Sequence, residues 1–453
     1  MSGQKPREIA ARVLGQRAGG EFVEALLERA LAPAALSPPD RHLCQELAYG
    51  VVRWQATLDW LISRKTAGRT QKAALQNLLR LGLYQIFWLE RIPNHAAVNE
   101  TVELAKQSGF GPQSGFVNAV LRGYLREFDS TRAALDELKR TRPHLGYSHP
   151  EWLAARWQQR WGPGLTGRLL EWDNLPPKTF ARVNALKTDP GRLLTQWRNE
   201  NVDYDFFRRD WLEDNLVFEL KSHPPLAALP SFQQGLFYVQ DPSTLLAPRQ
   251  LDPQPGETVL DFCAAPGGKL TFLAQLMRNQ GRLLAHEVSP ERLRLVNENC
   301  ARLGVACVKP VLPDGVAPAP ASVGSEGPAS PPVPLSAALA PRTADKVLLD
   351  APCSNTGVMR RRVDLRWRIR PEEIERLRST QLDLLRQAVR LLRPGGRLVY
   401  STCSLEPEEN QAVLETLLRE QSELRLEHQR ELRPFEDGVD GGYVAQLAVA
   451  ETL

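Results

Sequence analysis

Two of the six cysteines stand in short, turn-rich motifs where a thiol could act as a nucleophile. Cys353 lies in DAPCSNTG (residues 350–357) and Cys403 lies in YSTCSLEPEEN (residues 400–410), and each motif follows an apolar, strand-like run. Free cysteine is among the most buried residue types, so packing is the alternative to chemistry. The flanking Pro, Ser, Thr and Asn residues favour turns over a packed core. We therefore predict that both thiols are reactive.

The other four cysteines lie in different surroundings. Cys44, Cys300 and Cys307 fall within apolar helical or strand patterns, which favour burial as small hydrophobic residues. Cys263 belongs to a glycine-containing motif, and we expect it to pack there rather than to react. Neither a C-x-x-C pair nor histidines at metal-ligand spacing accompany these cysteines, so the sequence predicts no metal site and no disulfide framework.

The run VLDFCAAPGGKL (residues 259–270) joins a strand-like segment to a helical one through two glycines. Open α/β sheets bind ligands at the carboxyl ends of their strands, where glycine allows a close approach of the backbone. The run lacks the G-x-G-x-x-G pattern and the ending of a phosphate loop, which argues against a ligand with a pyrophosphate. Glu287 ends the next strand-like run and could accept hydrogen bonds from ribose hydroxyls. S-adenosylmethionine, a nucleoside without a pyrophosphate, is the leading candidate.

The predicted cofactor site combines the glycine motif with polar residues that follow the later strands. Its residues are Cys263, Ala264, Ala265, Pro266, Gly267, Gly268, Lys269, Glu287, Arg292, Asp314 and Asp350. Acids at strand ends are also common helix caps, which is the alternative for each acid taken alone. Several such acids together with the glycine motif favour a cofactor.

Three consecutive regions must position these residues. Residues 1–140 show apolar residues at three- and four-residue spacing, which predicts an all-helical domain. Residues 141–250 mix helical and strand-like runs and are predicted to form a small α+β connector. Residues 251–453 alternate strand-like and helical runs, the pattern of an α/β domain with a Rossmann-like parallel sheet. A proline-rich insert at about residues 315–342 is predicted to be disordered.

Length and charge limit the class of protein. The chain of 453 residues is too long for one core, and a net charge of +4 is too small for a chain that binds nucleic acid with its whole surface. Since neither a secretory leader nor an apolar run of membrane-spanning length occurs, we expect a cytoplasmic protein without a membrane partner. We also expect a monomer.

Three motifs in a fixed order carry a resemblance to a known family. DFCAAPGGK, DAPCSNTGVMRR and YSTCSLEPEEN resemble the motifs of the RsmB/NOP (Sun) family of S-adenosylmethionine-dependent RNA cytosine-C5 methyltransferases. The N-terminal runs ELAYGVVRW, LLRLGLYQI and IPNHAAVNETVELAK resemble the NusB-like RNA-binding domain of the bacterial ribosomal members. The resemblance implies a NusB-like domain, a connector and a class I methyltransferase domain, with the proline-rich insert outside the pattern.

The resemblance also implies roles for single residues. Cys403 would attack the base, and Cys353 would assist release of the methylated product. Asp350 would bind the edge of the cytosine, and Lys269 would lie near the catalytic cluster. A thiol is needed because cytosine C5 becomes nucleophilic only when a thiolate has added to C6. From the residues alone, either cysteine could be the one that attacks.

A basic run beside the P-C motif is the predicted RNA contact. RRRVDLRWRIR (residues 360–370) contains six arginines, a density that suits phosphate contact and base stacking. The alternative is a solvated basic face. The predicted RNA-binding residues are Arg360, Arg361, Arg362, Arg366 and Trp367, together with Arg182 and Asn184, which match a family segment beside the RNA path.

The predicted substrate is a cytosine of small-subunit (16S) ribosomal RNA, in a single-stranded or partly assembled form, because a paired base must be exposed before it reacts. Transfer RNA is the nearer alternative substrate, and the NusB-like region favours ribosomal RNA. A non-catalytic RNA-binding assembly factor is the alternative outside the enzymes, and the two thiols argue against it. Asn355 departs from the family pattern, since many relatives have glycine there, but Asn tolerates the left-handed conformation.

Overall fold

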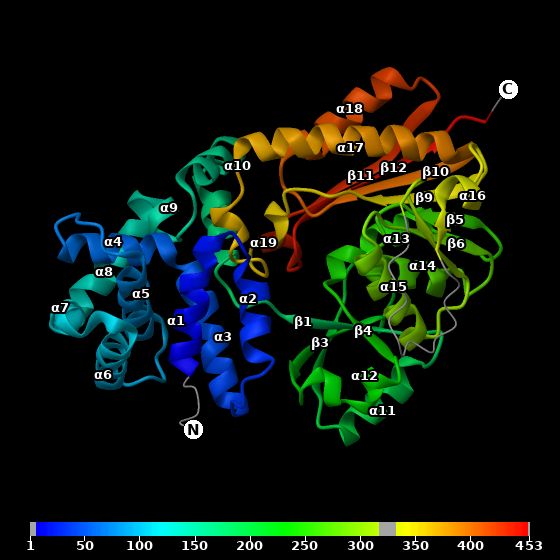
Figure 1. Cartoon of the computed structure of the whole chain (residues 1–453). Coiled ribbons are helices and arrows are strands. Elements are labelled where there is room, and N and C mark those ends of the chain that lie inside the picture. The colour runs from blue at the N-terminus through cyan, green and yellow to red at the C-terminus, as the bar shows by residue number, and fades with distance from the viewer. Residues whose placement is uncertain (1–5, 317–331, 452–453) are drawn as a thin grey trace. The chain divides into compact units, whose positions relative to one another are not determined.

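The computed structural model describes residues 6–316 and 332–451 of the chain. These residues form two compact units (Figure 1). One consists of Met1–Pro176 with Met359–Arg368, and the other consists of Pro177–Val358 with Ile369–Leu453. The predicted division of the chain into three parts near residues 140 and 250 stays a prediction. Across the described ranges, helices with the length and apolarity to cross a membrane are absent.

The first unit is all-helical, which confirms the prediction for the N-terminal region. Its helices are α1 (Pro6–Gln16), α2 (Val23–Leu31), α3 (Pro38–Arg53), α4 (Gln55–Lys65), α5 (Ala73–Trp88), α6 (Asn94–Ala105), α7 (Ser114–Arg126), α8 (Phe128–Thr141), α9 (Pro143–Gly146) and α10 (Glu151–Trp172). Helix α5 is apolar on nearly all sides and is buried among its neighbours, as expected of such a helix. Ser37 caps α3 by accepting a hydrogen bond from the backbone of Asp40.

A distant segment, Met359–Arg368, belongs to this helical unit. Asp364 is buried and accepts hydrogen bonds from Arg17 Nε at 2.7 Å and from the backbone N–H of Val23 at 2.9 Å. Arg366 is fully buried and donates to the carbonyls of Ser148 and Asp173. Such charge-assisted bonds satisfy groups that would otherwise be costly to bury.

The second unit begins with a small antiparallel sheet. Its strands are β1 (Thr179–Val183), β2 (Asp203–Phe207), β3 (Val217–Ser222) and β4 (Phe237–Val239), in the order β2-β3-β1-β4, with helices α11 (Pro190–Asn199) and α12 (Pro230–Gln233). Trp197 of α11 is fully buried against the sheet, with the rings of Phe218 and Phe237 edge-on to its indole. This aromatic cluster holds the small sheet to its helix.

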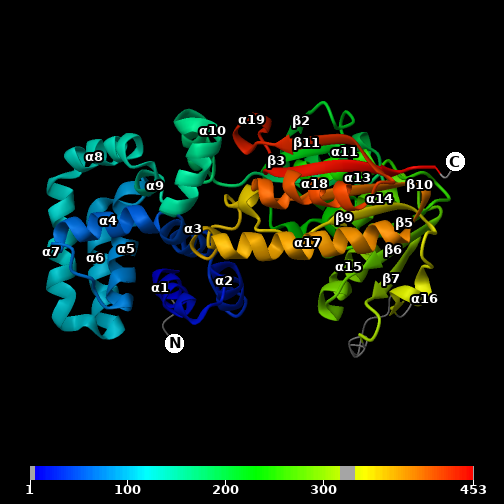
Figure 2. The same cartoon turned by 90° about the horizontal axis from the view of Figure 1, so that it is seen from above.

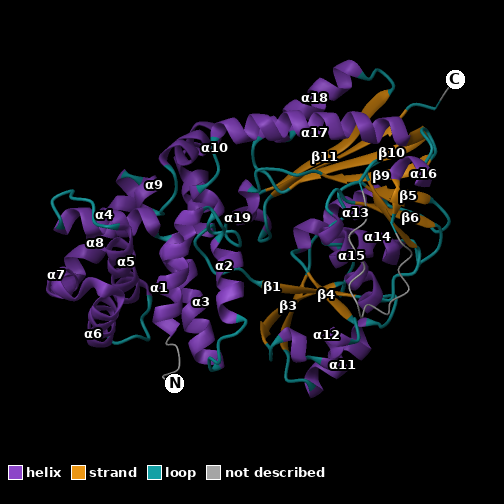
Figure 3. Ribbon diagram, in the orientation of Figure 1, coloured by secondary structure: helices purple, strands orange, loops and turns teal. Residues whose placement is uncertain are grey.

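The larger sheet of this unit has eight strands in the order β11-β12-β10-β9-β5-β6-β7-β8. Figure 3 draws its strands in orange, with β11, β10, β9, β5 and β6 labelled. Its strands are β5 (Thr258–Asp261), β6 (Arg282–His286), β7 (Val308–Leu312), β8 (Val333–Pro334), β9 (Ala344–Asp350), β10 (Leu392–Thr402), β11 (Leu424–Leu432) and β12 (Gly442–Val449). The helices around it are α13 (Leu246–Leu251), α14 (Gly268–Leu276), α15 (Pro290–Leu303), α16 (Leu335–Ala338), α17 (Pro371–Leu391), α18 (Gln411–Glu420) and α19 (Pro434–Asp437). Strands β5 to β10 pair in parallel, and β12 pairs antiparallel with β10 and β11.

Alternate residues of each strand pack on opposite faces of this sheet. Val259 and Leu348 join one core with residues of α13, α14 and α15. Leu260 and Leu349 join a second core with residues of α17 and α18, which lie along the other face (Figure 2). Burial on both faces explains why these strands read as continuous apolar runs, and it confirms the predicted Rossmann-like class.

The register of β9 and β10 sets the position of both cysteine motifs. The strands run parallel, and Ser401 of β10 lies opposite Asp350 of β9. The backbone N–H of Ala351 then donates to the carbonyl of Ser401 at 2.9 Å. The loops that follow the two strands therefore begin side by side, at the carboxyl ends of the strands.

The prediction of a disordered insert is wrong for its last part. Residues 332–342 are ordered: β8 pairs in parallel with β7 through Val311 and Val333, and α16 buries Ala338 against the larger sheet. A few apolar residues, such as Val333 and Ala338, hold this stretch against the larger sheet. The high proline content of the segment made their contribution difficult to recognise in the sequence. Residues 317–331 of the predicted insert lie outside the described residues.

Candidate active site

The two cysteine motifs lie next to each other at the carboxyl ends of β9 and β10 in the larger sheet. The sulfur atoms of Cys353 and Cys403 are 3.2 Å apart. Cys353 is buried, whereas Cys403 is partly exposed and is the thiol that a substrate reaches more easily. The hydrogen bond with Cys403, together with burial, raises the pKa of Cys353 well above the usual thiol range. Cys353 is therefore held as a neutral thiol beside Cys403.

Asn355 touches both cysteines and was not predicted as a site residue. Its side-chain oxygen accepts a hydrogen bond from the sulfur of Cys403 at 2.9 Å, and its amide nitrogen donates to the carbonyl of Cys353 at 2.6 Å. Its φ of 59° lies in the left-handed region, which suits glycine or asparagine. The departure from glycine at this position therefore adds a polar contact to the thiol pair. In the sequence, the feature that could have indicated this residue is the tolerance of asparagine for the left-handed conformation.

Lys269 and Asp350 form an ion pair close to the thiols. Lys269 Nζ lies 2.6 Å from one carboxylate oxygen of Asp350, and the hydroxyl of Ser401 donates to the other at 2.7 Å. Burial alone would lower the pKa of Lys269, but the carboxylate of Asp350 raises it, so the amine stays protonated. Lys269 also interacts electrostatically with Cys403. The ammonium group of Lys269 therefore places a positive charge next to the thiol pair.

The glycine motif forms a tight turn between β5 and α14. Gly267 has a φ of 104°, and a side chain at Gly268 would approach Tyr238 to 3.1 Å. Asp261, at the end of β5, is buried, and burial raises the pKa of its carboxyl to about 7. Burial likewise raises the pKa of Cys263, which packs against the core of the sheet. Cys263 is thus an unreactive part of the motif.

Glu287 and Arg292 lie beside this turn. One carboxylate oxygen of Glu287 accepts hydrogen bonds from the backbone of Val288 and Ser289 and lies 3.2 Å from Arg292. Arg292 also donates to the carbonyl of Ala265 at 3.2 Å. The other oxygen of Glu287, Oε2, is buried and lacks a hydrogen-bond partner within the described ranges. A buried acceptor of this kind fits a ribose hydroxyl, so these residues fit a nucleoside cofactor.

Asp314, another acid of the predicted cofactor site, follows β7. It is exposed, and it accepts hydrogen bonds from the backbone and the hydroxyl of Ser336 at 3.1 and 2.8 Å. Its contact with an adenine edge stays a prediction. Groups of three or more His, Cys, Asp or Glu that could hold a metal ion do not occur among residues 6–316 and 332–451.

The predicted RNA contacts are wrong for most of the basic run. Arg366 is buried on backbone carbonyls, and Arg360 is buried with its guanidinium 4.1 Å above the ring of Trp172. Trp367 packs on the helical core and donates its indole N–H to the carbonyl of Val52 at 2.7 Å. Arg361 is half-buried and Arg362 is exposed, so these two keep the predicted role as a proposal.

Arg182 and Asn184 are also buried, which contradicts their predicted contact with RNA. Arg182 donates to the carbonyl of Gly268 at 2.9 Å and to the hydroxyl of Thr271 at 3.0 Å. Asn184 donates to the carbonyls of Gly235 and Leu303. Arg182 thus supports the glycine turn, and Asn184 ties the small sheet to α15.

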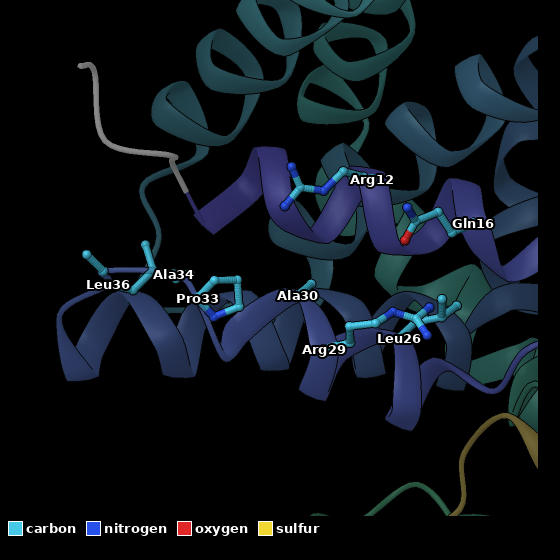
Figure 4. A pocket seen from close by; sticks show the side chains of 9 residues that line it. Arg12, Gln16, Leu26, Arg29, Ala30, Pro33, Ala34 and Leu36 are labelled. Carbon is cyan, nitrogen blue, oxygen red and sulfur yellow. The ribbon is translucent and has the colours of Figure 1, made fainter.

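A separate pocket lies in the helical unit, between α1 and the segment from α2 to α3 (Figure 4). Its volume is about 420 Å³, and Arg12, Gln16, Arg29 and Pro33 contribute to its wall. The wall contains no cysteine and no acid within the described residues, so it offers neither a nucleophile nor a base.

Models of known protein families match three regions of this chain. Residues 248–447 match the model described as 16S rRNA methyltransferase RsmB/F. Residues 4–126 match the NusB family, and residues 149–219 match the Methyltr_RsmF/B-like, ferredoxin-like domain. Together the matched regions cover most of the chain and include the cysteine site.

Relatives of similar length match most of this chain in a single alignment. The probable ribosomal RNA small subunit methyltransferase B of Synechocystis is 37% identical, over 92% of this chain and 87% of the relative. The ribosomal RNA small subunit methyltransferase B of Klebsiella pneumoniae is 33% identical, over 94% and 96%. A crystal structure of a methyltransferase homolog from Pyrococcus horikoshii is 31% identical, with a TM-score of 0.55 over 70% of this chain and 99% of that one. This chain belongs to the ribosomal RNA small subunit methyltransferase B family.

Proposed function

We propose that this methyltransferase transfers a methyl group from S-adenosylmethionine to C5 of a cytosine in 16S ribosomal RNA, through a covalent bond between Cys403 and C6. The observation that carries the proposal is the pair of thiols, 3.2 Å apart, beside the Lys269–Asp350 ion pair. Membership of the family gives the class of substrate. The thiols supply the reason why the carbon at position 5 is the atom that accepts the methyl group.

The residues of the site act in sequence on the base. The thiolate of Cys403 adds to C6, and the electron pair of the C5–C6 bond makes C5 nucleophilic. When bound, S-adenosylmethionine supplies the electrophilic methyl group that C5 takes. A base then removes the C5 proton, and the bond between sulfur and C6 breaks to restore the ring and the thiolate. Asp350 accepts hydrogen bonds from the amino edge of the cytosine and orients it.

The surroundings of the sulfurs support Cys403 as the nucleophile. Cys403 is the more exposed thiol, and the ammonium group of Lys269 acts on it. Cys353 has a pKa well above the usual range, because Cys403 bonds to it and because it is buried. Since a thiolate and not a thiol attacks, Cys353 is the weaker nucleophile. As a neutral thiol it gives its proton to the ring when Cys403 adds to C6, and the thiolate so formed then accepts the C5 proton during release.

The cofactor site gives a prediction that is independent of catalysis. Glu287→Ala removes the unpartnered acceptor Oε2 and is expected to weaken binding of S-adenosylmethionine by about 10- to 100-fold, the cost of losing a hydrogen bond to a charged group. Isothermal titration calorimetry measures this change. Glu298→Ala is the matched control, because Glu298 is an exposed acid on α15, the helix that follows Glu287. Equal affinity in Glu287→Ala and wild type would remove Glu287 from the site.

The proposed RNA is exposed at the target base, since a stacked and paired cytosine cannot receive a thiol at C6. The match to the NusB family favours ribosomal RNA over transfer RNA. Arg361 and Arg362 are the residues of the basic run that remain as RNA contacts. A monomer acting in the cytoplasm completes the proposal.

Labelled methyl transfer combined with bisulfite mapping tests the proposal. The purified protein is incubated with labelled S-adenosylmethionine and with 16S or transfer RNA from cells that lack the corresponding modification. We expect label in 16S RNA and a protected cytosine in its bisulfite map. Preferential labelling of transfer RNA would support the alternative substrate. A folded protein that binds S-adenosylmethionine but labels neither RNA would support a non-catalytic assembly factor.

A further inference from the structure

A buried acid lies beneath the two cysteine loops and has no part in the proposed chemistry. Glu409 follows Cys403 in the run EPEEN and is fully buried, in a short 3-10 turn at Pro407–Glu409. The hydroxyl of Tyr400 donates to the backbone carbonyl of Glu409 at 2.6 Å, which fixes the turn to β10. The carboxylate therefore has a defined position under the site.

The carboxylate of Glu409 joins the loop after β9 to the loop after β10. Its Oε1 accepts a hydrogen bond from the backbone N–H of Ser354 at 2.8 Å. Its Oε2 accepts from the hydroxyl of Ser404 at 2.5 Å and from the hydroxyl of Ser354. Ser354 directly follows Cys353, and Ser404 directly follows Cys403. The side chain of Glu409 is thus hydrogen-bonded to the residue that follows each of the two cysteines.

Helix α17 adds a third anchor to the same carboxylate. The side chain of Gln381 donates to Glu409 Oε1 at 3.0 Å and to the carbonyl of Pro352 at 2.9 Å. The two serine hydroxyls are also within 3.0 Å of each other. Ser354, Ser404, Gln381 and Glu409 are all buried. A buried network whose acceptor bonds to several elements holds those elements in one arrangement.

We propose that Glu409 is a positioning residue that sets the separation of Cys353 and Cys403. The proposal rests on the proposed function, because the separation matters only if both sulfurs act on one base. Glu409 contacts neither sulfur in this structure; it acts through Ser354 and Ser404. A shift of about 1 Å in a reacting group lowers the reaction rate about 100-fold. A residue that fixes the positions of both cysteine loops is therefore expected to have a large effect on the rate of methyl transfer.

The electrostatics of the carboxylate act in the same direction. Burial raises the pKa of Glu409, and the hydrogen bonds from Ser354 and Ser404 offset part of this rise. The charge of Glu409 contributes to the raised pKa of Cys353, after the hydrogen bond with Cys403 and burial. Glu409 therefore helps to keep Cys353 as a thiol while it holds the two loops together.

Disulfide trapping measures the separation of the sulfurs without RNA or cofactor. Diamide takes two hydrogen atoms from two thiols, so it is reduced to a hydrazine as a disulfide forms. The bond requires specific geometry, so its rate reports how the two sulfurs are held. The full-length protein is treated with diamide, and the Cys353–Cys403 peptide pair is quantified by mass spectrometry. Wild type is expected to form this disulfide readily.

Glu409→Gln removes the charge and replaces one of the two acceptor oxygens by an amide nitrogen, while it keeps the size of the side chain. We expect the Cys353–Cys403 disulfide to form about tenfold more slowly, the cost of one charged hydrogen bond. The turnover number for methyl transfer is expected to fall by about 100-fold, with the KM for S-adenosylmethionine unchanged. Glu415→Gln, on the exposed face of α18, is the matched control and is expected to behave as wild type in both assays.

Each outcome decides the proposal. A folded Glu409→Gln protein that forms the disulfide at the wild-type rate would overturn it, as would a wild-type protein that does not form the disulfide at all. If Glu409→Gln does not fold, Ser404→Ala removes a single bond to the carboxylate, and an unchanged disulfide rate in that variant overturns the proposal. A disulfide rate that depends on Glu409 in a protein without methyl transfer would support the positioning role and contradict the proposed function.

Discussion

Cys403→Ala is expected to reduce methyl transfer to RNA by about 10³-fold or more, the scale of loss when a catalytic nucleophile is removed. Without the sulfur, no thiolate adds to C6, and C5 remains too weak a nucleophile to take the methyl group. Binding of S-adenosylmethionine is expected to stay as in wild type, because the predicted cofactor residues do not include Cys403. Methyl transfer under single-turnover conditions and calorimetry with the cofactor measure the two quantities.

The control for this experiment is Cys307→Ala. Cys307 is a partly buried cysteine that packs beside β7, outside the thiol pair, and its loss is expected to leave transfer close to wild type. The assignment of the nucleophile is reversed if Cys403→Ala still transfers methyl groups while Cys353→Ala does not.

Cys353→Ala is expected to leave the protein joined to its methylated RNA. Cys403 still attacks C6 and C5 still receives the methyl group, but the group that handles the proton during release is missing. The bond between sulfur and C6 therefore persists for much longer than a wild-type turnover. A denaturing gel with labelled RNA separates the covalent complex from free RNA, and about one methyl group per protein is expected.

The double variant Cys353→Ala, Cys403→Ala tests the origin of that complex. It is expected to form none, because the attacking sulfur is absent. A complex that forms in the double variant would place the covalent bond on another residue. Rapid release of methylated RNA by Cys353→Ala would show that a group other than Cys353 completes the reaction.

The sequence predicted the elements that carry strong apolar patterns. Residues 374–392 belong to the alternating runs of the predicted α/β domain and have apolar residues at helical spacing, and α17 spans Pro371–Leu391. The leucine-rich run before Asp350 indicated a strand, and β9 ends at that residue. Both elements are buried in one core, so their patterns were unambiguous. Strand β11 (Leu424–Leu432) was missed because most of its residues are charged or polar and exposed, and it is ordered by pairing with β12.

The pairing of the cysteines was predictable, because two parallel strands that each end in a turn-rich motif must place those turns at one edge of a sheet. The contacts of Asn355 and Glu409 were not predictable. Asn355 depends on a left-handed turn that brings its amide to Cys403. Glu409 stands in an acidic run that resembles a solvated surface, and its burial depends on where Ser354 lies, far away in sequence.

For the basic run, residues 360–370, the sequence predicted exposed RNA contacts, but several of these side chains are buried. Six arginines in eleven residues resemble a surface for RNA, but the charge of each residue does not tell which side it faces. Arg366 is buried because Ser148, Asp173 and Asn174 provide carbonyl oxygens for its guanidinium. These acceptors lie about two hundred residues earlier, so only the folded chain reveals them.

Release of tritium from RNA labelled at C5 of its cytosines distinguishes methyl transfer to C5 from transfer to any other atom. A thiol-assisted transfer to C5 must expel the hydrogen at that carbon, whereas transfer to any other atom leaves it in place. We expect one tritium released into water for each methyl group incorporated, and no release with Cys403→Ala. Incorporation of methyl groups without release of tritium would contradict thiol-assisted transfer to C5.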